Sequence, residues 1–171
     1  MDNRETKSKQ WTEFLEKVGK IKFAMMTTES EGGVLRSRPM TTLDTEENGT
    51  LWFLTGKSTH LVRELETDSR VNLSYVASDH DTYLSIAGEA RLVEDTFKVK
   101  ELWNPAMKAW FPKGQDDPDL ALLKVEISDA EYWDVESKKM IALMRMVKAI
   151  AGHPDTRPDP GHGTLRPGRD V

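Results

Sequence analysis

Apolar residues recur along this chain at two spacings, and each spacing predicts one kind of element. Between residues 8 and 19 they fall at i, i+3, i+4 and i+7, as on one face of a helix that Ser8 can cap. That face consists of Trp11, Phe14, Leu15 and Val18. Elsewhere short apolar or alternating segments predict strands. They span residues 22–28, 34–42, 51–55, 71–75, 83–93, 123–127 and 130–135.

Turn and cap signals divide these segments. Residues 31–33 and 48–49 are glycine-containing turn signals of the kind that join hairpin strands. Gly88, inside a predicted strand, indicates a bulge or tight bend, which is common where a sheet curls into a barrel. The order of elements therefore predicts a mainly β fold with flanking helices (α+β), in the form of a closed or partly closed barrel.

Two more helices and an aromatic segment complete the pattern. Ser58 or Thr59 can cap a middle helix that carries Leu61, Val62 and Leu65 on one face. Residues 102–112 are rich in aromatics and predict a broken helix that is closed by a loop at 116–118. Ser137 can cap a last helix with an apolar face of Met140, Leu143, Met144 and Val147.

Length and composition fit one domain. The chain has 171 residues, and we expect a single domain over 1–152 followed by a disordered tail over 153–171, where Pro, Gly and charge dominate. The net charge of −5 argues against general nucleic-acid binding. With no cysteine, the chain has no disulfide, thiolate metal site or cysteine nucleophile. No secretory signal or membrane span is visible, so a cytoplasmic protein is the expectation.

Two arginines stand out in the second predicted strand. Because side chains alternate along a strand, Arg36, Arg38 and Met40 share one face. Two guanidinium groups so close together repel one another unless solvent screens them or an anion lies between them. Pro39 lacks an N–H, which places this strand at a sheet edge or a bulge.

The segment from Thr55 to His60 joins a strand to a helix in a way that suits a phosphate. Gly56 permits close backbone approach, Lys57 supplies charge, and Ser58 and Thr59 supply hydroxyls beside the first helical N–H groups. The ordinary alternative is a capped helix with a solvated lysine, and it is favoured when the segment is taken alone. The Walker spacing is absent.

Several segments in order resemble one family. They are Arg36-Ser37-Arg38-Pro39-Met40-Thr41, Leu51-Trp52-Phe53-Leu54-Thr55, Ser58-Thr59-His60, and residues 83–90, 102–105, 110–112 and 131–134. Together they are similar to the general stress protein branch of the pyridoxamine 5′-phosphate oxidase-like, FMN-binding split-barrel family. The resemblance covers roughly residues 8 to 150.

The resemblance implies a six-stranded antiparallel split β-barrel that forms a homodimer with FMN at the dimer interface; FAD is the less favoured flavin. It implies that Arg38, Pro39, Met40 and Thr41 lie along the flavin, that Leu54 and Thr55 lie at the ring edge, and that Ser58, Thr59 and His60 bind the phosphate. Lys57 is added by position, because Thr59-His60 stands where the oxidases carry Arg-Lys. Trp133 matches a family tryptophan that reaches the flavin region.

The residues after Trp133 depart from the oxidases that act on pyridoxamine phosphate. Those enzymes end in an Arg-x-His-like motif, whereas residues 136–140 here read Glu-Ser-Lys-Lys-Met. We therefore expect no such oxidase activity. The leading hypothesis is a flavin-dependent oxidoreductase of unknown substrate that takes hydride from a reduced nicotinamide or exchanges electrons with a small acceptor. The alternatives are a non-enzymatic flavin carrier or sensor and a flavin-free dimeric interaction module. No catalytic residue is named.

Other candidate side chains have two interpretations each. Trp103, Trp110 and Phe111 are equally compatible with a lid over the flavin and with core packing. Trp133 is more typical of core or interface than of catalysis. The run 79–81 (Asp-His-Asp) is chelating in type, but adjacent side chains diverge, so a turn is favoured over a metal site.

Overall fold

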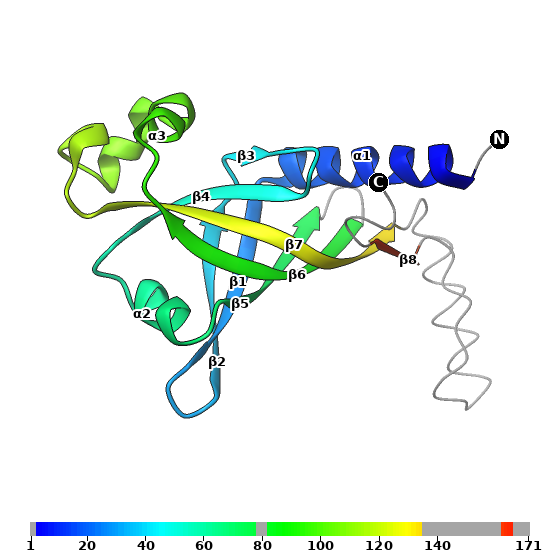
Figure 1. Ribbon diagram of the computed structural model, residues 1–171, viewed down its shortest axis with the longest axis horizontal. Helices are drawn as coiled ribbons and strands as arrows, with labels where there is room; N and C mark the ends of the chain where they lie inside the picture. The colour runs from blue at the N-terminus through cyan, green and yellow to red at the C-terminus, as the bar shows by residue number, and fades with distance from the viewer. Residues whose placement is uncertain (1–2, 78–81, 135–161, 166–171) are drawn as a thin grey trace.

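The computed structural model describes residues 3–77, 82–134 and 162–165. One antiparallel sheet runs in the order β2-β1-β5-β6-β7-β4-β3, with β8 paired to β7 (Figure 1). The strands are β1 (Phe23–Ser30), β2 (Val34–Thr41), β3 (Asp44–Thr45), β4 (Thr50–Gly56), β5 (Arg70–Ala77), β6 (Thr82–Val93), β7 (Leu120–Asp134) and β8 (His162–Leu165). The helices are α1 (Asn3–Ile21), α2 (His60–Thr67) and α3 (Thr96–Leu102), with the 3-10 turns η1 (Pro105–Ala109) and η2 (Gly114–Asp116).

The sheet curls into a split barrel. β2 at one end of the strand order comes into contact with β4 near the other end. The described sheet has eight strands where the sequence predicts six in the barrel, and the two additional strands, β3 and β8, are short. The prediction of a mainly antiparallel barrel with flanking helices is therefore confirmed.

The main core fills the barrel and the space under α1. The four residues of the predicted helix face are all buried, and they pack with inward side chains of β1, β4, β5, β6 and β7. Trp11 and Phe14 stack at 5.8 Å between ring centroids. Burying such aromatic and aliphatic side chains stabilises the fold by about 1.5–3 kcal/mol each. No helix in the described parts of the chain is long and apolar enough to cross a membrane.

A second, smaller core lies on the other face of β4, beneath α3 and the two 3-10 turns. It is built from Trp52, Val99, Phe111, Leu120 and Leu122, with Leu54, Val93, Leu102 and Trp103 packed against it. Lys98 fastens α3 to this region, because its Nζ donates to Asp44 Oδ2 at 2.8 Å and lies 5.4 Å from the Trp52 ring centroid. The helix over 96–102 precedes the broken helix predicted from residue 102 onward.

The strand β7 is continuous where the sequence predicts two strands. Its pairing with β6 shifts by one residue, since Ala87 lies opposite Asp129 and Gly88 opposite Ile127. Ser128 is the extra residue, so alternation changes phase there and the strand reads as two segments. A Cβ at Gly88 would lie 2.5 Å from the Glu126 carbonyl oxygen. The predicted bulge at Gly88 is therefore confirmed.

The last described strand lies within the segment that the sequence predicts to be disordered. Residues 162–165 form β8, and Leu165 is 4% exposed in the main core. At these four residues the structure differs from the predicted disorder, since they pair with β7 and the buried Leu165 side chain stabilises the pairing. The predicted helix after Ser137, the run 79–81 and the remainder of the tail lie outside the described residues.

Candidate functional site

The strand β2 is an edge of the sheet, as Pro39 indicates. Its register places Arg36, Arg38 and Met40 opposite Thr28, Met26 and Ala24, which are buried, so the predicted common face is the one directed toward the interior. Thr42 N donates to Lys22 O at 2.7 Å. Because hydrogen-bonded pairs recur at every second residue of an antiparallel ladder, the backbone groups of Pro39 and Thr41 point away from β1.

Arg38 is held by two buried side chains. Its Nη2 donates to Glu64 Oε2 and its Nη1 to Thr28 Oγ1, each at 2.6 Å. The Thr28 hydroxyl in turn donates to the same Glu64 oxygen at 2.6 Å. Glu64 is 8% exposed and Thr28 is 1% exposed. This triad ties β1, β2 and α2 together and neutralises the guanidinium.

The Glu64 carboxylate is the counter-ion of Arg38, whereas Arg36 is exposed to solvent. Burial alone would raise its pKa, but hydrogen bonds from Thr28 and Arg38, together with the charges of Arg38 and Arg36, hold the pKa below its ordinary value. The acid is therefore ionised at neutral pH. Sequence reasoning missed Glu64, although its place on the apolar face of α2 beside Leu61 and Leu65 was a usable signal, because a buried carboxylate needs a cation.

The predicted phosphate segment already holds a carboxylate. Ser58 N donates to Asp119 Oδ1 at 2.9 Å, and Ser58 Oγ donates to Asp119 Oδ2 at 3.2 Å. Gly56 allows this approach, since a Cβ there would lie 2.5 Å from Asp119 Oδ2. The donors at this end of α2 thus suit an oxyanion. Asp119 is 61 residues from Ser58 in sequence, and no local pattern points to it.

The remaining predicted residues of this segment divide between surface and interior. Lys57 and His60 are exposed. Thr59 bonds back to its own turn, with Oγ1 donating to Gly56 O at 2.8 Å. Thr55 is buried, and Leu54 packs against the second core. Side-chain contact with a ligand is therefore open to Lys57 and His60, whereas Thr55 and Leu54 are engaged in packing.

An exposed apolar surface adjoins the edge strand. Phe23 and Met25 on β1, Val76 on β5 and Tyr83 on β6 are large and exposed, Phe23 to 68%. Tyr83 lies between Val76 and Trp133 in the strand register, and Trp133 is half-buried. We call these five residues the outer apolar face. Contiguous exposed apolar residues of this kind mark binding or association surfaces.

The outer apolar face continues onto β2. Thr41 lies opposite Phe23, and Pro39 lies opposite Met25. The backbone groups of Pro39 and Thr41 that point away from β1 are thus adjacent to apolar side chains. The structure brings Pro39, Thr41 and Trp133 to one side of the sheet and Arg38 and Met40 to the other.

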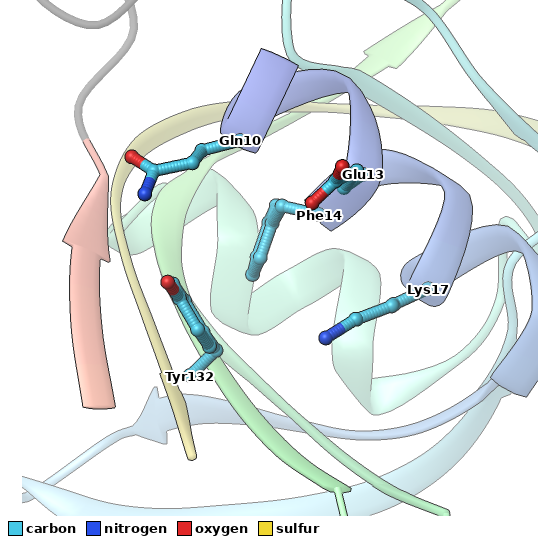
Figure 2. A pocket seen from close by; sticks show the side chains of 5 residues that line it. All are labelled: Gln10, Glu13, Phe14, Lys17 and Tyr132. Atoms are coloured by element: carbon cyan, nitrogen blue, oxygen red, sulfur yellow. The ribbon is translucent and has the colours of Figure 1, made fainter. Parts of the chain in front are cut away.

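A small pocket lies between α1 and β7 (Figure 2). Gln10, Glu13, Phe14, Lys17 and Tyr132 line it. It encloses about 40 Å³, whereas sites for ligands of flavin size enclose roughly 300–1,000 Å³. The Lys17 ammonium lies 5.6 Å from the Tyr132 ring centroid, directed at the ring. The pocket is a packing defect between helix and strand rather than a cofactor site.

The aromatic segment after α3 divides between core and surface. Phe111 is buried, and Trp103 packs against the second core. Trp110, between them in sequence, is 75% exposed. The packing interpretation therefore holds for Trp103 and Phe111, and Trp110 is the one of the three that can contact a ligand.

Known proteins resemble this chain in fold and in sequence. A family model described as "Pyridoxamine 5'-phosphate oxidase like" matches residues 9–156. Protein bli-3 of Neurospora crassa is 32% identical over 147 residues, which cover 79% of this chain and 70% of bli-3. A general stress FMN/FAD binding protein of Xanthomonas citri has a solved structure with a TM-score of 0.65 and 32% identity, covering 80% of this chain and 93% of that one. A protein related to general stress protein 26, from Clostridium acetobutylicum, gives 0.66 at 25% identity, covering 76% and 92%.

These likenesses and the described architecture define a protein with the split-barrel fold. The chain belongs to the pyridoxamine 5′-phosphate oxidase-like family, in its general stress protein branch.

Proposed function

We propose that this protein binds FMN at a homodimer interface built on the outer apolar face and the edge of β2. The observation that carries the proposal is the adjacency of Pro39 and Thr41 to Phe23 and Met25. A flat flavin ring needs apolar surface for its faces and backbone donors and acceptors for its polar edge, and this edge strand supplies both. A partner subunit would cover the ring from the other side.

The residues present fit the flavin in distinct roles. Pro39 and Thr41 offer backbone groups at the strand edge, and Met40 between them fixes the strand, because its side chain packs against the main core. Arg38 lies on the other side of the strand, facing α2, and there supplies N–H donors to the phosphate-bearing end of the flavin, with its charge balanced by Glu64. Leu54 and Thr55 shape the ring edge from beneath. Trp133 contributes an aromatic surface next to Tyr83.

The phosphate belongs at the start of α2. Ser58 N and Oγ already hold an oxyanion in Asp119, and Lys57 and His60 are exposed beside them. Thr59 fixes the turn. A single phosphate at a helix start favours FMN, while FAD would add a second phosphate and an adenosine that need further contacts. The FMN phosphate would compete with the Asp119 carboxylate for Ser58.

The reaction class follows from the cofactor. FMN, when bound, accepts a hydride or single electrons from a reduced nicotinamide or a small partner. The chain's part is to bind and orient the ring, to exclude water with the outer apolar face, and to hold Arg38 as a fixed donor. The proposed activity is that of a flavin-dependent oxidoreductase of unknown substrate, distinct from pyridoxamine phosphate oxidase.

The visible absorption spectrum tests the proposal. The purified protein, as isolated or after addition of FMN, should show the visible absorption of a flavin. On gel filtration this absorption should elute with the dimer. Under anaerobic conditions reduced nicotinamide should bleach it. A yellow protein that is not bleached would favour a flavin carrier or sensor. A colourless protein that does not take up FMN would leave a dimeric interaction module.

A further inference from the structure

Two different strands of the chain pair with the same edge of β7. β6 pairs with one side of β7 along Thr82–Val93. On the other side, β4 pairs with the first half of β7, and β8 pairs with the second half. β8 runs antiparallel, with Ala130 opposite Leu165 and Trp133 opposite His162. The C-terminal segment therefore occupies a backbone edge that the barrel itself leaves open (Figure 1).

The Leu165 side chain anchors this strand in the barrel. Leu165 is 4% exposed and belongs to the main core. Its register partner Ala130 is 1% exposed and small, which leaves room for a bulky aliphatic residue from the neighbouring strand. An edge with a pocket for an alternate side chain is how strand-addition sites combine affinity with selectivity.

The anchor is weak compared with the rest of the sheet. β8 forms four register pairs with β7, whereas β6 forms twelve. β7 ends at Asp134 and β8 begins at His162, so their pairing joins distant parts of the chain, and the entropy of loop closure opposes it. A four-residue edge strand held against that cost opens far more readily than the barrel unfolds.

We propose that the β7 edge at Ala130–Trp133 is a strand-addition site for an extended peptide with a bulky aliphatic side chain opposite Ala130, and that the chain's own C-terminal segment is its resident, exchangeable occupant. The site lies beyond the proposed flavin function and does not depend on it. Release of β8 would expose unpaired backbone next to Trp133, and a peptide of the same pattern would take its place.

A reversible crosslink tests the occupant. The chain has no cysteine, so Glu131→Cys together with Thr164→Cys introduces one pair at directly opposed register positions. Oxidation of the full-length variant should give a disulfide within one chain. Disulfide-linked dimers instead would show that β8 pairs between copies and would overturn the occupant proposed here.

The same variant tests the site. The probe is a fluorescent synthetic peptide of residues 160–168, and the matched control peptide carries Leu165→Asp. The reduced protein should bind the probe at least tenfold more tightly than the oxidised protein, and neither form should bind the control. Equal binding to both forms, or no binding to the reduced form, would overturn the proposal.

Hydrogen exchange of the unmodified full-length protein gives an independent measurement that needs no variant. Backbone amides of β8 should exchange at least tenfold faster than those in the centre of β6, because β8 opens locally. If the β8 amides exchange as slowly as those of β6, β8 is a permanent strand. That result would overturn the proposal that β8 can be exchanged for another peptide.

Discussion

Arg38 and Glu64 form one buried unit, with Nη2 of the first 2.6 Å from Oε2 of the second. Arg38 comes from the edge strand β2, and Glu64 from the helix α2 that starts at the proposed phosphate site. The pair carries no net charge. Arg38 therefore acts on a ligand as a fixed set of N–H donors, and the charge that attracts a phosphate has to come from Lys57.

Replacing Glu64 tests the energetic weight of this unit. Glu64→Gln should lower the free energy of unfolding at pH 7 by about 1–3 kcal/mol, because a charge-assisted hydrogen bond is lost and Arg38 loses its counter-charge. Urea unfolding measures the change. Glu66→Gln, on the exposed side of the same helix, is the matched control and should change stability little. Equal effects of the two substitutions would contradict a special role for Glu64.

The Glu64 pair also sets a pH dependence. The pKa of Glu64 in the folded chain lies below its ordinary value of 4.5, so the ionised carboxylate stabilises the fold fully above about pH 4.5. That stabilisation is lost as the pH falls through the lowered pKa. The stability difference between the wild type and Glu64→Gln should shrink across this acidic range and stay constant from pH 6 to 8. A difference that is unchanged at low pH would refute the pairing.

Arg38 should matter to flavin binding and Arg36 should not. Arg38→Ala is expected to weaken FMN affinity by about 1–3 kcal/mol, the usual worth of a charge-assisted contact. Arg36 is exposed and bonds through Nε to Ser30 Oγ at 3.3 Å, so Arg36→Ala is the control. Fluorescence titration with FMN measures both. Unchanged affinity in a folded Arg38→Ala protein would remove Arg38 from the site.

Asp119 should weaken the binding of phosphate-bearing flavin. Asp119→Asn removes the negative charge from the Ser58 donors, so FMN affinity should rise by about 1–2 kcal/mol. Riboflavin, which has no phosphate, should bind the variant and the wild type equally. Asp116→Asn, an exposed acidic residue nearby in the chain, controls for general charge. A parallel gain for riboflavin would place the phosphate elsewhere.

A charge on the outer apolar face should prevent dimerisation. Phe23 is 68% exposed in the single chain, so Phe23→Glu should leave the barrel folded but convert a dimer into a monomer in analytical ultracentrifugation. Phe97 on α3 is 83% exposed and lies outside this face, which makes Phe97→Glu the matched control. If Phe23→Glu stays dimeric, the interface is on another surface.

Leu165 should contribute to stability although it lies in a tail that looks dispensable in sequence. Leu165→Ala is expected to cost about 1–2 kcal/mol, less than the ~2–5 kcal/mol usual for a buried leucine, because the loss cannot exceed the free energy that holds a locally opening strand in place. Leu92→Ala, at a site that is 41% exposed, should cost much less. Thermal melting of both variants tests the contribution, and equal melting temperatures would contradict the burial of Leu165.

The periodic elements and the arginine face could be predicted from the sequence because they depend on local spacing. Trp11, Phe14 and Val18 form the buried helix face, Gly88 marks the bulge, and Arg36 and Arg38 share one side of an edge strand. The family resemblance predicted the split barrel. The helix face, the bulge and the arginine face each depend on residues that lie within a few positions of one another in the sequence.

The unpredicted features join residues that are distant in sequence. Asp119 reaches Ser58 across 61 positions, and β8 pairs with β7 from the far end of the chain. Neither contact leaves a local pattern. Glu64 is intermediate, since its helix position pointed inward but its partner Arg38 could be assigned only once α2 was placed against β1 and β2.

The bulge at Ser128 also governs how the length of this chain can vary. Ala87 and Gly88 are consecutive on β6 but face Asp129 and Ile127, so no residue of β6 lies opposite Ser128 in the register. Deleting Ser128 would straighten β7 and leave every other side chain on its present side. Deleting a residue elsewhere in β7 would turn one end of the strand over and move buried leucines into solvent. Ser128 is therefore the position at which we expect homologous chains to gain or lose a residue.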